Sequence, residues 1–215
     1  MSLLDEILEN KIIAIVRGAA AEQCSAVVNA LYEGGIRFVE ITYDQSKPES
    51  WPVTAATIGR LAEEFKGRVH IGAGTVTNPE LVQMTYDNHG EYIISPDTNV
   101  EVIKKTKELG MVSMPGAMTP SEIMTAHNAG ADLVKIFPAA NLGTSYIKAI
   151  KAPLNHIHFM AVGGVNEDNI ADFLKAGCSG AGVGGNLAKK DWIAAGEYFR
   201  LTEAARKLLE KVRGE

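Results

Sequence analysis

Eight short apolar segments recur along this chain of 215 residues, and longer amphipathic segments lie between them. A short apolar segment bounded by turn residues is typical of a strand that is buried in a parallel sheet. Eight strands that alternate with helices favour one compact α/β domain over residues 1–215, the (β/α)₈ TIM barrel. The predicted strands span residues 12–16, 38–42, 69–72, 92–95, 112–114, 133–137, 158–162 and 180–183.

The intervening segments carry signals for helix starts and ends. Asn78 precedes a proline, Thr119 and Glu122 have the spacing of a capping box, and glycines follow several apolar helical segments. An open doubly wound sheet is the alternative, but Arg17-Gly18-Ala19 after the first strand lacks the glycine fingerprint of dinucleotide-binding folds. The predicted helices include residues 21–32, 79–87, 100–109, 121–129 and 167–176, with 2–10 covering the barrel bottom and 191–213 forming an amphipathic C-terminal helix.

Charge and cysteine content exclude several classes of function. The formal net charge is −5 and no run of lysine or arginine occurs, so neither nucleic acid nor an anionic membrane is an expected partner. Cys24 and Cys178 have no disulfide or metal-site spacing, which indicates a reduced, cytoplasmic setting. The first residues show no signal-peptide pattern, and no apolar segment is long enough to span a bilayer.

Lys135 is a charged residue inside the predicted strand 133–137. Alternation along a strand places Leu133, Lys135 and Phe137 on one face. Burial of an ammonium group is costly and lowers its pKa, which favours the neutral amine that attacks carbonyl groups. The sequence therefore indicates either a nucleophilic lysine or a lysine held in a structural ion pair.

Glu40 presents the same problem in the predicted strand 38–42. Neither Glu40 nor Lys135 has an opposite charge on its own strand, so the two can meet only across the barrel. They form either an ion pair, or a Schiff-base lysine with a proton shuttle whose pKa values are tuned by a low-dielectric pocket.

Two glycine clusters follow the predicted strands seven and eight, at residues 163–164 and 180–185. Glycines at these positions allow backbone N–H groups to approach a phosphate, and barrels often bind phosphate in these two loops. Tight turns alone also explain glycine pairs. The two positions together indicate a phosphate site.

A metal site is not predicted, because no cluster of two histidines and a carboxylate follows the strands. His70, His156 and His158 lie at strand starts, which is the end of a barrel that serves stability. Cys178 lies beside a glycine before the last strand, where a small packed residue is expected. We therefore expect no metal, no cofactor and no cysteine nucleophile.

Taken together, the motifs resemble those of the 2-keto-3-deoxy-6-phosphogluconate (KDPG) and 4-hydroxy-2-oxoglutarate (KHG) aldolases, a family of class I aldolases that includes a 6-phosphogalactonate branch. The resemblance covers nearly the whole chain. The matching segments are residues 15–17, 39–42, 71–76, 94–96, 114–116, 135–138, 161–165 and 182–184.

The resemblance implies a role for each matching position. Lys135 would form a Schiff base with the keto carbon of a phosphorylated keto acid, and Glu40 would move protons through a water molecule. The products would be pyruvate and glyceraldehyde 3-phosphate, and the enzyme would be a homotrimer. The implied substrate-binding residues are Arg17, Thr75, Pro96, Phe137, Gly163, Gly164, Gly184 and Gly185.

Two positions depart from the phosphogluconate pattern and concern the choice of substrate. Asp44 stands where many members have an arginine that binds the substrate anion, and Gly185 stands where many have serine. The phosphogalactonate branch also lacks that arginine, so phosphogalactonate or hydroxy-oxoglutarate are alternative substrates. A sugar-phosphate isomerase or epimerase that uses Glu40 as base, and a non-catalytic sensor of sugar acids, are the alternatives from other classes.

Overall fold

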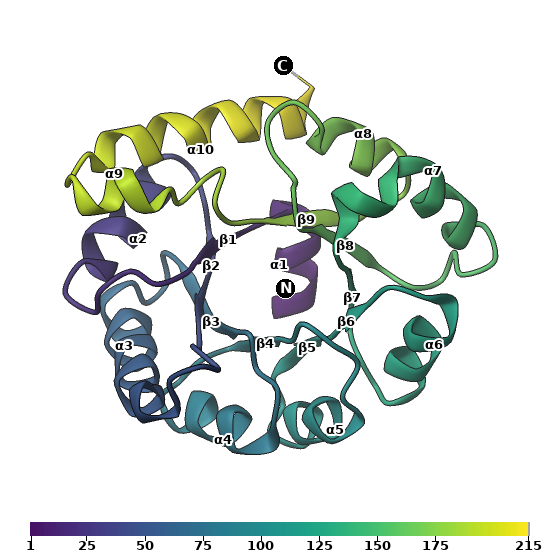
Figure 1. The fold of residues 1–215 in the computed structure, drawn as a ribbon, viewed down its shortest axis with the longest axis horizontal. Coiled ribbons are helices and arrows are strands. Elements are labelled where there is room, and N and C mark those ends of the chain that lie inside the picture. The colour runs from purple at the N-terminus through teal and green to yellow at the C-terminus, as the bar shows by residue number, and fades with distance from the viewer. Residues whose placement is uncertain (215) are drawn as a thin grey trace.

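A computed structural model describes residues 1–214 of the chain. Nine strands, all paired in parallel, form a barrel, and Figure 1 looks nearly along the axis of this barrel. The order β5-β4-β3-β2-β1-β9-β8-β7-β6 follows the chain around the ring. The strands are β1 (Ile12–Val16), β2 (Phe38–Thr42), β3 (His70–Gly74), β4 (Tyr92–Ile94), β5 (Val112–Met114), β6 (Gly116–Ala117), β7 (Val134–Ile136), β8 (Phe159–Val162) and β9 (Gly180–Val183).

The predicted (β/α)₈ barrel is confirmed, with its fifth strand divided at Pro115 into β5 and β6. Proline has no N–H to donate to a strand ladder, so a break at this residue is expected. Strand β5 pairs with β4, whereas β6 pairs with β7. The Pro115 carbonyl accepts the Lys135 N–H at 2.9 Å, and the Ser113 carbonyl accepts the Asp132 N–H at 3.0 Å. The segment around Pro115 thus closes the barrel.

Helices surround the barrel, as Figure 1 shows. Asn78 accepts a hydrogen bond from the Leu81 N–H, and Thr119 with Glu122 forms a complete capping box, so both predicted caps are confirmed. The helices are α1 (Leu3–Asn10), α2 (Cys24–Glu33), η1 (Pro48–Ser50), α3 (Trp51–Glu64), α4 (Pro79–Asp87), α5 (Val100–Glu108), α6 (Pro120–Asn128), α7 (Ala139–Lys151), α8 (Ile170–Lys175), α9 (Lys190–Ala194) and α10 (Tyr198–Arg213).

The prediction of one helix over residues 191–213 is wrong, because α9 and α10 are separate. Gly196 between them adopts a φ of 70°, which a continuing right-handed helix does not allow. The predicted bounds of β1, β2, β5, β9 and α4 are confirmed at both ends, and the other predicted boundaries differ by at most three residues. Strand β3, for example, extends to Gly74, two residues beyond the predicted end.

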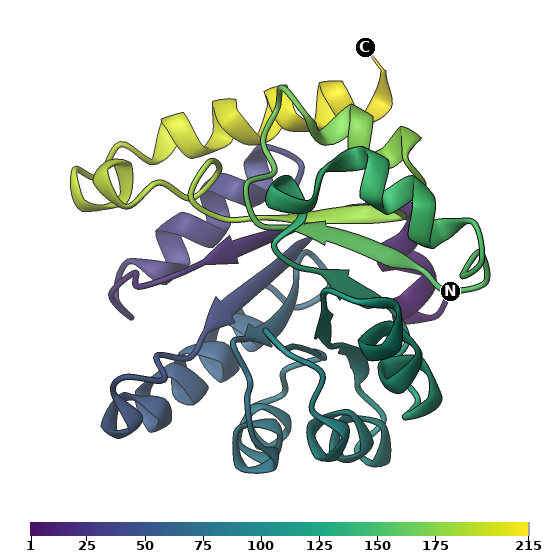
Figure 2. The ribbon, with the colours of Figure 1, turned by 45° about the vertical axis from the view of Figure 1, so that its right-hand side comes forward.

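Apolar side chains form two cores. An inner core fills the barrel and includes Phe38, Tyr92, Leu133 and Met160, while the outer core lies between strands and helices. Ile7 of α1 belongs to the inner core, so the predicted cover of the barrel bottom is confirmed. Figure 2 shows α1 at the end where the strands start, opposite their arrowheads. The other end of the barrel is therefore left open for chemistry.

The part of the chain that the structure describes contains no helix that is both long and apolar enough to cross a membrane.

His70 connects the bottom helix to the barrel through two carboxylates. Its Nε2 lies 3.0 Å from Glu6 Oε2, and its Nδ1 lies 2.8 Å from Glu91 Oε2. The hydrogen bond with Glu91, reinforced by both negative charges, raises the pKa of His70 above its usual value of 6.5. The folded state therefore binds this proton more tightly than the unfolded state does. The resulting stability is fully present below pH 6.5 and is lost as pH rises through the folded-state pKa.

Replacing His70 with glutamine, which stays neutral, is expected to lower Tm by about 2–4 °C at pH 5.5, as loss of a pair worth ~1 kcal/mol would. The difference from wild type should shrink at pH 9, where neither side chain is charged. Thermal unfolding at both pH values measures the effect. An equal difference at both would mean that packing against Phe38, whose ring centroid is 4.7 Å away, is the cause.

Candidate active site

One cavity of about 230 Å³ opens at the carboxyl ends of the strands. It gathers Lys135 and every residue that the sequence predicted to bind substrate. Because the barrel is parallel, residues distant in sequence meet at this one end. The predicted residues that line it are Arg17, Thr75, Pro96, Lys135, Phe137, Gly163, Gly164, Gly184 and Gly185.

Lys135 lies on β7 and is only 6% exposed. Its Nζ lies 4.9 Å from the centroid of the Phe137 ring. Burial lowers the pKa of Lys135; the Glu40 carboxylate opposes this shift, and the Arg17 charge adds to it. No ion pair joins Lys135 to a carboxylate within residues 1–214. A structural ion pair therefore does not account for Lys135, and its burial shifts the equilibrium towards the neutral amine.

Glu40 is buried and is not among the residues that line the cavity. Its side chain is 2% exposed, and a Cβ at Gly74 of β3 would overlap its Oε1. Glycine at position 74 therefore makes room for the carboxyl group. Burial raises the pKa of Glu40 to about 7, against the lowering effect of the Lys135 and Arg17 charges. A carboxyl group with this pKa can accept and return a proton near neutral pH.

Thr75 lies at the cavity wall, where its backbone is strained and two side chains donate hydrogen bonds to it. Its φ of 59° lies in the left-handed region, which is uncommon for a β-branched residue. The Arg17 Nη2 donates to Thr75 Oγ1 at 3.3 Å, and the Gln45 Nε2 donates to the Thr75 carbonyl at 2.7 Å. Gln45 was not predicted as a site residue, because nothing in its local pattern distinguishes it from an ordinary loop residue.

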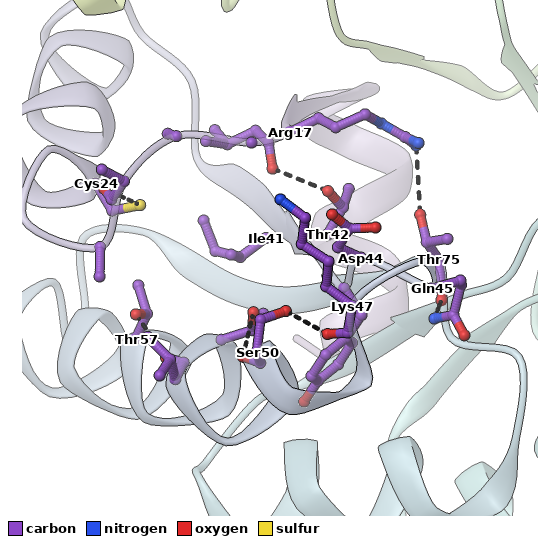
Figure 3. Close-up of a pocket in the computed structure, with 18 of the residues that line it drawn as sticks. Arg17, Cys24, Ile41, Thr42, Asp44, Gln45, Lys47, Ser50, Thr57 and Thr75 are labelled. Atoms are coloured by element: carbon purple, nitrogen blue, oxygen red, sulfur yellow. Dashed lines mark hydrogen bonds between the residues drawn. The ribbon is translucent and has the colours of Figure 1, made fainter.

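A second cavity, of about 670 Å³, lies on the other side of Arg17 and Thr75 and is shown in Figure 3. Asp44 and Lys47 line it, together with Lys190. The Asp44 Oδ1 accepts hydrogen bonds from the Ser46 N–H at 2.9 Å and the Ser46 hydroxyl at 2.6 Å, which lower the pKa of Asp44. A fixed negative charge therefore stands near the cavity wall formed by Arg17.

The glycine loops border the first cavity on the side of β8 and β9. Gly163 and Gly164 have φ values of 93° and 75°, so their backbone requires glycine. Asn186 donates through Nδ2 to the Val165 carbonyl at 3.0 Å and ties the two loops together. Asn186 was missed in the sequence, since its partner is twenty-one residues away in the chain.

The cysteines and histidines do not line the cavity that contains Lys135, although Cys24 lines the second cavity. Burial raises the pKa of Cys178 to about 12, and that of Cys24 also rises, so neither thiol readily forms a thiolate. His70 is at the start of β3, as predicted. Within residues 1–214, no three His, Cys, Asp or Glu side chains cluster in a way that could hold a metal ion.

Both the sequence and the fold are similar to those of known proteins. The sequence profile described as "KDPG and KHG aldolase" matches residues 4–204. The 2-dehydro-3-deoxy-6-phosphogalactonate aldolase of Escherichia coli K12 is 38% identical over 82% of this chain and 83% of its own. The KHG/KDPG aldolase of the same organism is 31% identical over 88% and 86%. A solved structure described as native KDPGal superposes with a TM-score of 0.86, at 34% identity, over 94% of both chains.

Proposed function

Since the chain belongs to the KDPG and KHG aldolase family, we propose that it cleaves a 2-keto-3-deoxy-6-phospho-sugar acid through a Schiff base on Lys135. The enzyme is a lyase, so the isomerase, epimerase and sensor alternatives are set aside. The observation that carries the proposal is the burial of Lys135 in the cavity without an ion-pair partner among residues 1–214.

The first half of the reaction forms the imine. The neutral Nζ of Lys135 attacks the C2 keto carbon, and the resulting carbinolamine loses water to give a protonated imine. Burial of Lys135, which lowers its pKa, supports this step because only the neutral amine carries a free electron pair. Glu40 would relay the protons through a water molecule, since it is buried and does not line the cavity.

The second half breaks the C3–C4 bond. Glu40, as the carboxylate, would remove the C4 hydroxyl proton through the same water, and the C3–C4 electron pair would move into the imine to give an enamine. The three-carbon aldehyde leaves, and the enamine takes a proton at C3. Hydrolysis of the imine then releases pyruvate and restores the Lys135 amine.

The remaining cavity residues would hold the substrate at its two anionic ends. Thr75 and Arg17 are joined by a hydrogen bond at 3.3 Å and would bind the pyruvyl carboxylate. Pro96 and Phe137 would shape the pocket around the imine. The phosphate would bind at the loops that contain Gly163, Gly164, Gly184 and Gly185, where several backbone N–H groups would donate to it together.

The substrate that we favour is 2-keto-3-deoxy-6-phosphogalactonate, which would give pyruvate and glyceraldehyde 3-phosphate. The 38% identity to the phosphogalactonate aldolase, against 31% to the KHG/KDPG aldolase, supports this choice. Asp44 in place of an arginine also supports it. A coupled assay of pyruvate release should rank this substrate above its phosphogluconate and hydroxy-oxoglutarate counterparts in kcat/KM. A higher value for phosphogluconate would reverse the assignment.

Borohydride trapping tests the Schiff base directly. Incubation with pyruvate and sodium borohydride should add about 72 Da, the mass of a reduced pyruvyl imine, to the peptide that contains Lys135. Intact-protein and peptide mass spectrometry measure the adduct. Lys148, an ordinary lysine of α7, should carry none. If the adduct is absent, or if it persists in Lys135→Ala, the mechanism is wrong.

The phosphate assignment predicts the effect of a new charge at Gly185. A side chain fits there, because no atom lies within 4 Å of an added Cβ. Gly185→Asp should raise KM for the phosphorylated substrate about 10–100-fold by repulsion between like charges. Gly185→Asn, which is neutral and of similar size, should change it much less. Steady-state kinetics with the phosphorylated and unphosphorylated sugar acids distinguish the two effects, and an equal loss with both acids would contradict the assignment.

We also propose that the enzyme is a cytoplasmic homotrimer. Family membership supports the oligomer, and the two free, buried cysteines suit a reducing compartment. Sedimentation analysis at several concentrations would refute the trimer if it gave the mass of a single chain.

A further inference from the structure

Two buried polar atoms inside the barrel have no hydrogen-bond partner among the side chains and backbone that the structure describes. They are Glu40 Oε2 and the Tyr92 hydroxyl. Both side chains are at most 2% exposed. Buried polar groups are nearly always hydrogen-bonded, so each of these atoms calls for a partner.

The strand register places Glu40 and Tyr92 in the same layer of the barrel. Glu40 on β2 is paired with Gly72 on β3, and Ala73 is paired with Ile93, so Tyr92 on β4 is level with Gly72. Neighbouring strands are ~4.8 Å apart, which puts the Cα atoms of Glu40 and Tyr92 about 10 Å apart. Only a glycine lies between them.

The Tyr92 ring occupies the space above that glycine. A Cβ on Gly72 would overlap the Cδ2, Cε2 and Cζ atoms of Tyr92, and a Cβ on Gly74 would overlap the Glu40 carboxyl group. The tyrosine ring and the carboxyl group therefore lie side by side along the glycine face of β3. Phe38, the aromatic neighbour of Tyr92 at 6.0 Å between ring centroids, offers no polar atom.

We propose that Tyr92 is a positioning residue: its hydroxyl donates a hydrogen bond to a single buried water molecule, which in turn donates to Glu40, and this bridge orients the carboxyl group and favours its ionised form. The consequence for catalysis, though not the bridge itself, rests on the proton-transfer role proposed above for Glu40.

The charges around the pair are consistent with a tyrosine donor. Lys135 from β7 and Arg17 from the end of β1 act on Glu40, and Glu91 at the start of β4 acts on Tyr92. Burial, with the negative charges of Glu40 and Glu91, raises the pKa of Tyr92 well above its usual value, so its hydroxyl keeps its proton. A hydroxyl that stays protonated stabilises a carboxylate and lowers that carboxylate's pKa.

The test measures the ionisation of Glu40 in wild type and in Tyr92→Phe. Protein labelled with ¹³C at the glutamate carboxyl carbon is titrated by NMR, and the Glu40 signal is identified by its loss in Glu40→Gln. Removal of the donor should move the Glu40 titration upward by about one pH unit. Tyr86→Phe removes a hydroxyl from a residue that is 45% exposed and should leave the titration unchanged.

The pH below which kcat/KM falls should rise by the same amount in Tyr92→Phe. A role in packing alone would lower Tm without moving either curve, and an unchanged NMR titration would overturn the proposal. If wild type releases no pyruvate from any of the three substrates, the proposed function fails, while the NMR titration still decides whether Tyr92 and Glu40 are bridged.

Discussion

Lys135→Met is expected to lower kcat for pyruvate release about 10⁴-fold or more, because no other group can form the imine. It should also raise Tm, since methionine has a similar size and avoids the cost of burying an ammonium group that has no ion-pair partner among residues 1–214. The stability comparison is cleanest at pH 5.5. There Glu40, with a pKa of about 7, is largely protonated and loses no ionic partner when the lysine is removed.

Lys135→Arg is the matched control for this experiment. It keeps a positive charge but supplies no nucleophile, so it should be equally inactive without the gain in Tm. Single-turnover kinetics and thermal unfolding measure the two effects separately. Activity of Lys135→Met within tenfold of wild type would mean that the reaction does not pass through an imine on this residue.

Glu40→Gln is expected to lower kcat about 10²–10⁴-fold, the usual contribution of a general acid-base group. It should also change the shape of the pH profile. Burial raises the pKa of Glu40 to about 7, so the proposed base is protonated below pH 7 and ionised above it. In wild type, kcat/KM should therefore fall tenfold for each pH unit below the pKa of about 7.

In Glu40→Gln, the fall of kcat/KM below pH 7 should disappear, because glutamine does not ionise. Glu63→Gln, at an exposed position of α3, should keep both the wild-type rate and the wild-type pH dependence of kcat/KM. Initial rates between pH 5.5 and pH 9 measure the profiles. If kcat/KM still falls below pH 7 in Glu40→Gln, the ionisation belongs to another group.

Much of the architecture could be predicted because its signals are local. Apolar segments bounded by glycine and proline identified the strands, and the inward alternation of β7 placed Lys135 in the barrel. The caps at Asn78 and Thr119 depend on contacts three residues apart, which the sequence displays directly. The division of the fifth strand at Pro115 was missed. It shows only in the pairing, because the residues before Pro115 pair with β4 and those after it pair with β7.

The site likewise contains residues that the sequence indicated and residues that only the structure revealed. Lys135 and Glu40 stand out in the sequence because burial of a charge in an apolar strand is costly. The family motifs indicated the residues around them. Gln45 and Asn186 carry no such signal. Their importance comes from hydrogen bonds to Thr75 and Val165, which lie on other loops.

The sequence by itself determined the barrel and the placement of Lys135 and Glu40 inside it, because strand periodicity, helix caps and charges within apolar strands are properties of neighbouring residues. Only the tertiary structure decided which groups surround Glu40. The register of β2, β3 and β4 brings Glu40, Gly72 and Tyr92 into one layer, and burial there raises the pKa of Glu40 to about 7. Register and burial depend on closure of the whole barrel, and no local pattern encodes them.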